Sequence, residues 1–181
     1  MARNIEIKAR IDSLDVFEER AAALADQRPI VLIQDDTFFS CESGRMKLRA
    51  FPDGVGELIY YRRPDKSGPK ESFYVISPTN NPDSLREALS FGYGQIGRVR
   101  KRRILYLSGV NRIHLDRVEG LGDFLELEIV LTGDQTTEMG VATARALLSR
   151  LGITEDCLIE GAYLDLLNEA WLEKGNRLGL P

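Results

Sequence analysis

Regular alternation between charged and apolar residues constrains the fold of this chain more than any other feature. In residues 3–11, RNIEIKARI, every second side chain is polar or charged from Asn4 onward, and those between are isoleucine or alanine. Successive side chains of a β-strand point to opposite faces, so this segment is predicted to be a strand with one apolar and one ionic face. Residues 44–51 and 124–131 alternate in the same way. A chain built from such segments is expected to fold mainly as β-sheet.

Turn and capping residues divide the rest of the chain into further strands and helices. Strands are predicted over residues 3–11, 30–41, 44–51, 56–63, 70–76, 96–108, 111–118 and 124–131. Helices are predicted over residues 13–26, 83–91, 136–151 and 161–174. Asp12 or Ser13 is expected to cap the first helix, and Asp83 or Ser84 the second. Most strands are joined by short turns and are therefore antiparallel, and eight such strands either close into a barrel or form a sandwich.

Length and composition limit the possible domain organisation and cellular location. The chain has 181 residues, of which 43% are hydrophobic, enough for one domain with its own core. We expect this domain to span residues 1–175, followed by a frayed tail over 176–181. The sequence has no run of about 18 apolar residues and no secretory signal, so a cytoplasmic protein is expected.

Composition also argues against several kinds of partner. The net charge of −4 does not favour binding to nucleic acid or to a membrane. The basic run RVRKRR at 98–103 continues into the apolar ILYL, which favours a strand over a nucleic-acid site. The single histidine, His114, argues against a zinc site of the usual kind. Cys41 and Cys157 are isolated in the sequence and are expected to be reduced.

The charged strand faces have two interpretations. Each could be the solvated outer face of an ordinary strand. The pattern recurs, however, in segments far apart in the sequence and carries both signs, which favours a barrel with an ionic interior. Buried charges must be paired, hydrated or bound to a ligand. Because Lys and Arg suit phosphate oxygens and Asp and Glu suit a hard divalent cation, this second interpretation predicts a polyphosphate carrying Mg²⁺ or Mn²⁺.

The same residues resemble a known family. NIEIKAR resembles the ExExK signature of the CYTH superfamily, the triphosphate tunnel metalloenzymes, which include class IV adenylyl cyclases, thiamine triphosphatases and inorganic triphosphatases. The resemblance continues along nearly the whole chain, through GRMKLR, YYRRP, RKRRILY, HLDRVEGLGDFLELE and GAYLDLL. It implies an α+β fold, an eight-stranded antiparallel β-barrel forming a tunnel with flanking and C-terminal helices. It also implies a triphosphate ligand, Mg or Mn as cofactor, and a homodimer.

The resemblance assigns roles to particular residues. The carboxylates expected to bind metal are Glu6, Asp116, Glu126 and Glu128. The cations expected to bind substrate are Lys8, Arg45, Lys47, Arg49, Arg63, Lys70, Lys101 and Arg103. Among these, the expected catalytic residues are Lys8, Arg45, Lys47, Lys101 and Arg103. Periodicity alone does not choose between Arg100 with Arg102 and Lys101 with Arg103, so the second pair rests on the resemblance.

One departure from the family pattern leaves the activity open. The first Glu of ExExK is Asn4 here, whose amide oxygen can coordinate a cation but brings no charge. The style of GLGDFLELE favours a class IV adenylyl cyclase that converts ATP to cyclic AMP and pyrophosphate. A triphosphatase acting on an organic or inorganic triphosphate is one alternative. A non-catalytic module that binds nucleotide or polyphosphate is the other.

Overall fold

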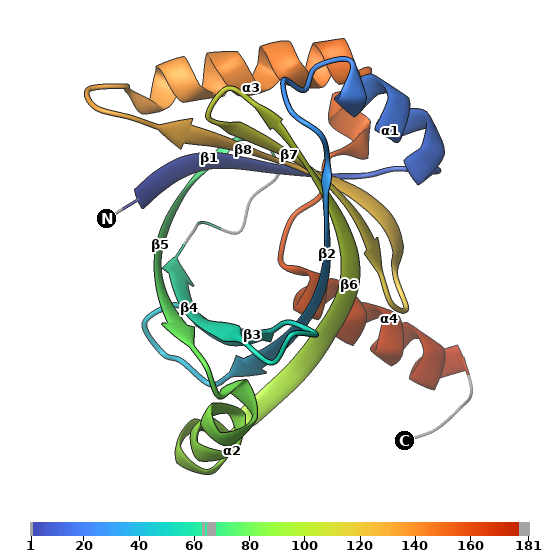
Figure 1. The fold of residues 1–181 in the computed structure, drawn as a ribbon. Coiled ribbons are helices and arrows are strands. Elements are labelled where there is room, and N and C mark those ends of the chain that lie inside the picture. Colours follow the sequence, from blue (N-terminus) through green and yellow to red (C-terminus); the bar gives the residue numbers. More distant parts are fainter. Residues whose placement is uncertain (1, 63, 65–67, 178–181) are drawn as a thin grey trace.

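Eight antiparallel strands form the body of the molecule, for which a computed structural model describes residues 2–62, 64 and 68–177. The strands are β1 (Ala2–Arg10), β2 (Ile30–Phe39), β3 (Arg45–Ala50), β4 (Gly56–Arg62), β5 (Lys70–Thr79), β6 (Gln95–Ser108), β7 (Asn111–Val118) and β8 (Gly122–Leu131). They close into a barrel in the order β1-β5-β4-β3-β2-β6-β7-β8 (Figure 1). The α+β barrel expected from the resemblance is therefore confirmed, and the sandwich is not formed.

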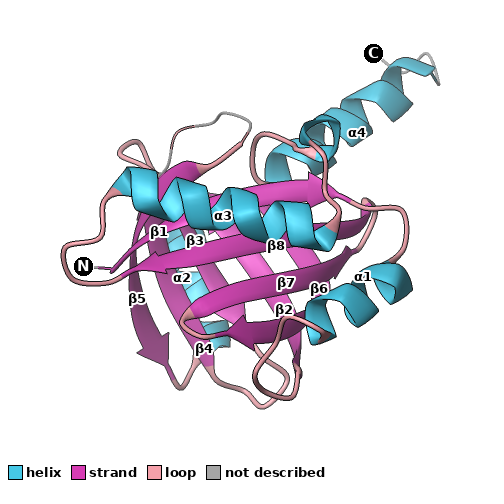
Figure 2. Ribbon diagram, turned by 90° about the horizontal axis from the view of Figure 1, so that it is seen from above, coloured by secondary structure: helices cyan, strands magenta, loops and turns pink. Residues whose placement is uncertain are grey.

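Helices cover one side of the barrel and close one of its ends. In the described part of the chain they are α1 (Leu14–Ala22), α2 (Pro82–Tyr93), α3 (Thr137–Leu151), α4 (Tyr163–Arg177) and a 3₁₀ turn over Glu155–Cys157. Figure 2 shows α3 lying along β1 and β8, with α1 beside it. None of these helices is long and apolar enough to cross a membrane.

The main hydrophobic core lies between the outer face of the barrel and the helices, instead of inside the barrel. In β1 the alternate residues Ile5, Ile7 and Ala9 point outward and are fully buried. They pack with the outward residues of β7 and β8 and with the apolar side of α3, including Leu151. Burial of each large aliphatic side chain is worth about 1.5–3 kcal/mol. Because the apolar faces of the strands supply this core outside, their charged faces line the inside.

The start of α2 and the end of α1 differ from the sequence predictions. Helix α2 begins at Pro82 and is capped by Asn81, whose side chain accepts a hydrogen bond from the Ser84 amide at 3.2 Å. Neither Asp83 nor Ser84 is therefore the cap, because proline at the first helical position makes the preceding residue the cap. Helix α1 ends at Ala22 instead of continuing to residue 26, since the Asp26 amide donates to the Leu107 carbonyl at 3.0 Å and ties this segment to β6.

The C-terminal segment is held against the end of β1. The amide of Ile159 donates to the carbonyl of Lys8 at 3.0 Å, and Leu158 forms an isolated bridge with Ala9. This attachment brings the start of α4 to one end of the barrel. Helix α4 then continues to Arg177, two residues into the segment expected to be a frayed tail.

Candidate functional site

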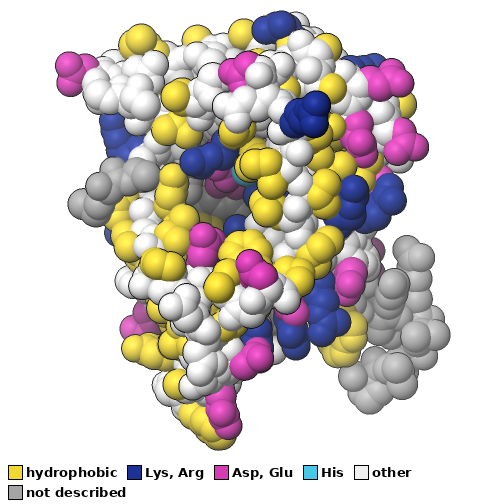
Figure 3. Space-filling model, viewed as in Figure 1, with side chains coloured by type: hydrophobic (Ala, Val, Ile, Leu, Met, Phe, Trp, Pro, Cys, Tyr) yellow, Lys and Arg dark blue, Asp and Glu magenta, His cyan; other side chains and the backbone are white. Residues whose placement is uncertain are grey.

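The interior of the barrel is an ionic cavity of about 470 Å³, to which every strand contributes side chains. Figure 3 shows it as a hollow with acidic and basic side chains around it. The cavity changes character along its length, as the inner face of β6 illustrates. Val99 packs with Tyr163 of α4 at one end, Lys101 and Arg103 follow, and Leu105 lines the cavity beyond them. The inner face of β6 thus changes from a valine beside α4, through two cations, to a leucine.

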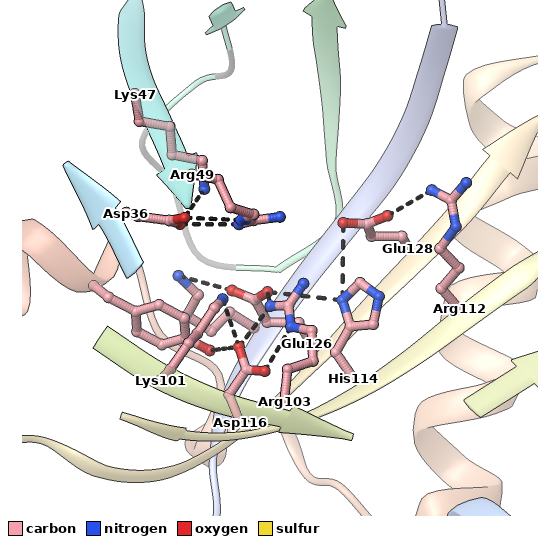
Figure 4. A network of polar contacts seen from close by, with 12 residues as sticks. Asp36, Lys47, Arg49, Lys101, Arg103, Arg112, His114, Asp116, Glu126 and Glu128 are labelled. Carbon is pink, nitrogen blue, oxygen red and sulfur yellow. Dashed lines mark hydrogen bonds and ion pairs between the residues drawn. The ribbon is translucent and has the colours of Figure 1, made fainter. Parts of the chain in front are cut away.

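One wall carries a group that we call the β2–β3 cluster: Asp36, Lys47 and Arg49 (Figure 4). Arg49 donates from Nε to Asp36 Oδ1 at 2.8 Å and from Nη2 to Oδ2 at 2.9 Å. Lys47 donates from Nζ to Asp36 Oδ2 at 2.7 Å. The cluster forms because Asp36 and Arg49 stand opposite each other in the β2–β3 register. Lys47 lies two residues from Arg49 and so shares its face of the sheet.

A second group, the β6–β7 cluster, consists of Asp116, Lys101 and Arg103. Arg103 donates from Nε to Asp116 Oδ1 at 2.6 Å and from Nη2 to Oδ2 at 2.5 Å, and Lys101 donates to Oδ2 at 2.9 Å. Arg103 also bonds Glu126, which pairs with Lys8 at 3.1 Å. The β6–β7 register places Asp116 directly opposite Arg103.

Beside these clusters, β7 and β8 present a third set of polar groups. Arg112 donates to Glu128 at 3.0 Å. His114 Nδ1 lies 3.9 Å from both Glu126 and Glu128 (Figure 4). Glu6 stands opposite Glu128 in the β1–β8 register and also lines the cavity. The acidic groups of β1 and β8 therefore share one wall.

Tyr163 closes the end of the cavity at α4. Its hydroxyl donates to Asp116 Oδ2 at 3.0 Å, and its ring centre lies 3.8 Å from Lys8 Nζ and 4.8 Å from Lys101 Nζ. Cations over an aromatic face are stabilised by the ring quadrupole. Tyr163 is thus both a packed core residue, as its surroundings of Phe124 and Val99 show, and part of the ionic site.

The buried charges shift one another's titration. Burial alone would raise the pKa of Asp36, but Arg49 and Lys47 together hold it well below its usual range. Asp116 and Glu126 have lowered pKa values for the same reason, because the attraction of neighbouring Arg and Lys outweighs burial. These carboxylates are therefore ionised at neutral pH. Such buried pairs add little net stability, but removing one partner leaves an uncompensated charge and costs several kcal/mol.

The structure places most of the predicted site residues in this cavity. Those that line it are Lys8, Lys47, Arg49, Lys101, Arg103, Glu6, Glu126 and Glu128. Lys101 and Arg103 are each 5% exposed and point inward, whereas Arg100 and Arg102 are exposed, which resolves the ambiguity of the basic run. Asp116 lies just behind the cavity wall, fully buried.

Two predicted binding residues, Arg45 and Lys70, are placed differently, and a third is not among the described residues. Arg45 pairs with Asp165 of α4 at 2.8 Å and lines a separate cavity of about 140 Å³. Lys70 is 1% exposed and stands opposite Glu6 in the β1–β5 register. Arg63 lies outside the described residues.

Asp36 and Arg112 are among the cavity residues that were not predicted from the sequence. Asp36 shares the inward parity of Gln34 and Phe38 on β2, so the alternation could have indicated it. The adjacent Asp35 obscured that signal, since it faces outward and pairs with Arg98 at 2.6 Å. Arg112 has the parity of His114 on β7 and could have been found in the same way.

The wall formed by β1 and β8 suits a divalent cation that is shared with a ligand. Glu6, Glu126 and Glu128 offer carboxylate oxygens there. The buried Asn4 Oδ1 and His114 Nδ1 lack hydrogen-bond partners among the described residues. Oxygen ligands of this kind fit Mg²⁺ or Mn²⁺. No three metal-ligating side chains converge in the part of the chain described, so such a cation would take its remaining ligands from phosphate and water.

Fold and site together define a class of protein, closed antiparallel barrels with an ionic, ligand-sized interior. The CYTH domain matches residues 2–163, and the chain belongs to the CYTH family. It is 25% identical over 178 residues to the adenylate cyclase CyaB of Aeromonas hydrophila, covering 92% of this chain and 89% of that one.

Solved structures show the same fold. The PH1012 protein of Pyrococcus horikoshii OT3 superposes with a TM-score of 0.81 at 25% identity, covering 91% of this chain and 99% of that chain. HpAC1 from Hippeastrum, described as having a dominant triphosphatase activity, superposes with a TM-score of 0.65 at 16% identity, covering 92% and 95%.

Proposed function

We propose that this protein is a divalent-metal-dependent enzyme that acts on a nucleoside triphosphate, converting ATP to cyclic AMP and pyrophosphate. One observation carries the proposal: two Lys–Arg pairs and the carboxylates of Glu6, Glu126 and Glu128 share one cavity of about 470 Å³. Clustered Lys and Arg suit the phosphate oxygens of a polyphosphate. The similarity to CyaB of Aeromonas hydrophila supports the cyclase reaction.

Apolar side chains among the lining residues favour a substrate with an organic part. Leu32, Phe51, Ile76 and Leu105 line the same cavity as the charged residues. Inorganic triphosphate would leave this surface uncovered, whereas a nucleoside would bury part of it. The substrate would therefore lie with its phosphates among the cations and its base toward these residues.

The chain's own residues act mainly by positioning and charge neutralisation. Lys8, Lys47, Arg49, Lys101 and Arg103 hold the phosphates. Glu6, Glu126 and Glu128 would hold the divalent cation, which supplies Lewis-acid stabilisation of the charge that develops on the phosphate oxygens. The ribose 3′-oxygen then bonds to the α-phosphorus while the bond to the bridging oxygen breaks, so that pyrophosphate and one proton leave.

Two other functions remain as alternatives. In a triphosphatase, water attacks the terminal phosphorus and orthophosphate leaves, and the structural similarity to HpAC1 favours this reaction. A binding module without turnover is favoured by Asn4, which replaces a charged metal ligand by an amide.

Product analysis with ATP and Mg²⁺ or Mn²⁺ separates the three functions. Cyclic AMP with pyrophosphate supports the proposal, and ADP with phosphate supports the triphosphatase. Metal-dependent binding by calorimetry without any product supports the binding module. Glu128→Gln is expected to lower turnover at least about 100-fold, because it removes a metal-side charge. Glu138→Gln on the exposed face of α3 should leave turnover unchanged, and equal turnover in both variants would refute the role of Glu128.

A further inference from the structure

The β2–β3 and β6–β7 clusters repeat one arrangement at two places in the barrel. In each, an Asp on one strand stands directly opposite an Arg on the next, and a Lys lies two residues before that Arg. Strands β2 and β6 pair with each other, with Gln34 opposite Lys101, so the two clusters lie side by side on one wall. The repetition indicates a shared role.

The hydrogen bonds match atom for atom. Both arginines donate to the carboxylate from Nε and Nη2. Both lysines donate to the same carboxylate oxygen, Oδ2. Asp36 is 2% exposed and Asp116 is fully buried, and both oxygens of each are surrounded by donors. A carboxylate gripped in this way has little capacity left for a metal ion.

This geometry leaves some N–H groups of each arginine and lysine that do not donate to the Asp. Nη1 of Arg49 and Nη1 of Arg103 have no hydrogen-bond partner among the residues that the structure describes. Both side chains line the cavity. Each lysine has further N–H groups beyond the one given to its Asp. Arg and Lys can thus keep their Asp and still contact phosphate.

We propose that Asp36 and Asp116 are matching positioning residues, each holding one Lys–Arg pair so that the two pairs together clamp a single polyphosphate. The inference rests on the proposed function only in that the ligand is a triphosphate. It assigns Asp116 to the cations instead of to the metal, and it gives a role to Asp36. The alternative is that each Asp competes with phosphate for the cations.

Asp36→Asn distinguishes these roles by the sign of its effect. The variant keeps the shape but removes one negative charge from the cavity, so mere competition predicts tighter binding of inorganic triphosphate. Positioning predicts a dissociation constant about tenfold higher, because the amide cannot accept the whole Arg and Lys grip. The measurement is calorimetry in EDTA, with thermal unfolding to show that each variant is folded. Asp36→Glu keeps the charge but displaces the carboxylate, so the positioning role predicts that it weakens triphosphate binding to a similar extent. This variant decides between the two roles if Asp36→Asn does not fold.

Asp116→Asn tests the assignment of that residue away from the metal. Positioning predicts an approximately tenfold loss in EDTA, whereas a metal ligand would affect binding only when Mg²⁺ is present. Asp35→Asn is the matched control, since Asp35 is the adjacent residue and pairs with Arg98 outside the barrel; its dissociation constant should stay within about twofold.

Each remaining result is decisive. Unchanged or tighter binding in Asp36→Asn or Asp36→Glu overturns the positioning role while the triphosphate function stands. A wild-type protein that binds no triphosphate, with or without Mg²⁺, overturns the proposed function and this inference with it.

Discussion

Lys47 illustrates at the residue scale how burial and pairing oppose each other. Burial and the adjacent Arg49 lower its pKa to about 8, although Asp36 lies 2.7 Å away and favours the charged form. The pKa of Asp36 is in turn held low by Arg49 and Lys47, so its carboxylate stays ionised. Lys47 therefore loses its charge as the pH rises through about 8, within reach of ordinary assay conditions.

This value predicts a pH dependence for triphosphate binding. Above about pH 8 the free protein loses the Lys47 proton, and affinity should fall by up to about tenfold per pH unit. Lys47→Arg keeps its charge and should flatten most of this profile between pH 7 and 9.5. Calorimetry with the same ligand makes the ligand's own ionisation common to both proteins. Parallel profiles for the two proteins would contradict the assignment.

At the scale of elements, the contact between α3 and the barrel depends on a glycine. A Cβ on Gly140 would lie 2.6 Å from Ile5 and 2.7 Å from Leu131, both packed in the main core. Gly140→Ala is therefore expected to lower the free energy of unfolding by about 1–3 kcal/mol, although alanine favours helix by about 1 kcal/mol. Urea unfolding measures this change.

The matched control is Gly92→Ala in α2, where the added Cβ would meet nothing within 4 Å. There only helix propensity acts, and stability should rise by up to about 1 kcal/mol. If both substitutions changed stability in the same direction, close packing of α3 would not be the reason for Gly140.

For the whole molecule, the ionic interior makes stability sensitive to acid. Asp36, Asp116 and Glu126 have lower pKa values in the folded protein than when unfolded, so their contribution is complete at neutral pH. It is lost as the pH falls below the unfolded values near 4. Urea unfolding should show a loss of about 4 kcal/mol between pH 6 and pH 3.

A variant identifies the groups responsible for this acid sensitivity. Asp36→Asn removes one of the three carboxylates and should show a smaller loss between the same pH values. Asp35→Asn, whose carboxylate is on the outside, should lose nearly as much as the wild type. An identical slope in all three proteins would show that the loss arises elsewhere.

Local pattern was sufficient to predict the strands and the chemical character of their faces. The alternation in residues 3–11 and 124–131 assigned Glu6, Glu126 and Glu128 to the charged faces of their strands, and all three line the cavity. This assignment is possible because side chains alternate between the two faces along a strand. The capping residue of α2 was misassigned, since Pro82 is the first helical residue and the cap is therefore Asn81.

What sequence determined by itself, then, is an ionic face on each of several strands, since a period of two is a local property of the backbone. Which carboxylate meets which cation was decided only by the tertiary structure. Closure of the barrel pairs β1 with β8 and sets Lys8 opposite Glu126, far along the chain. Docking of the C-terminal helix α4 similarly pairs Arg45 with Asp165, which lies 120 residues away in the sequence. Strand register and helix docking are long-range choices that bury the apolar faces outside, and the pairing of charges inside follows from them.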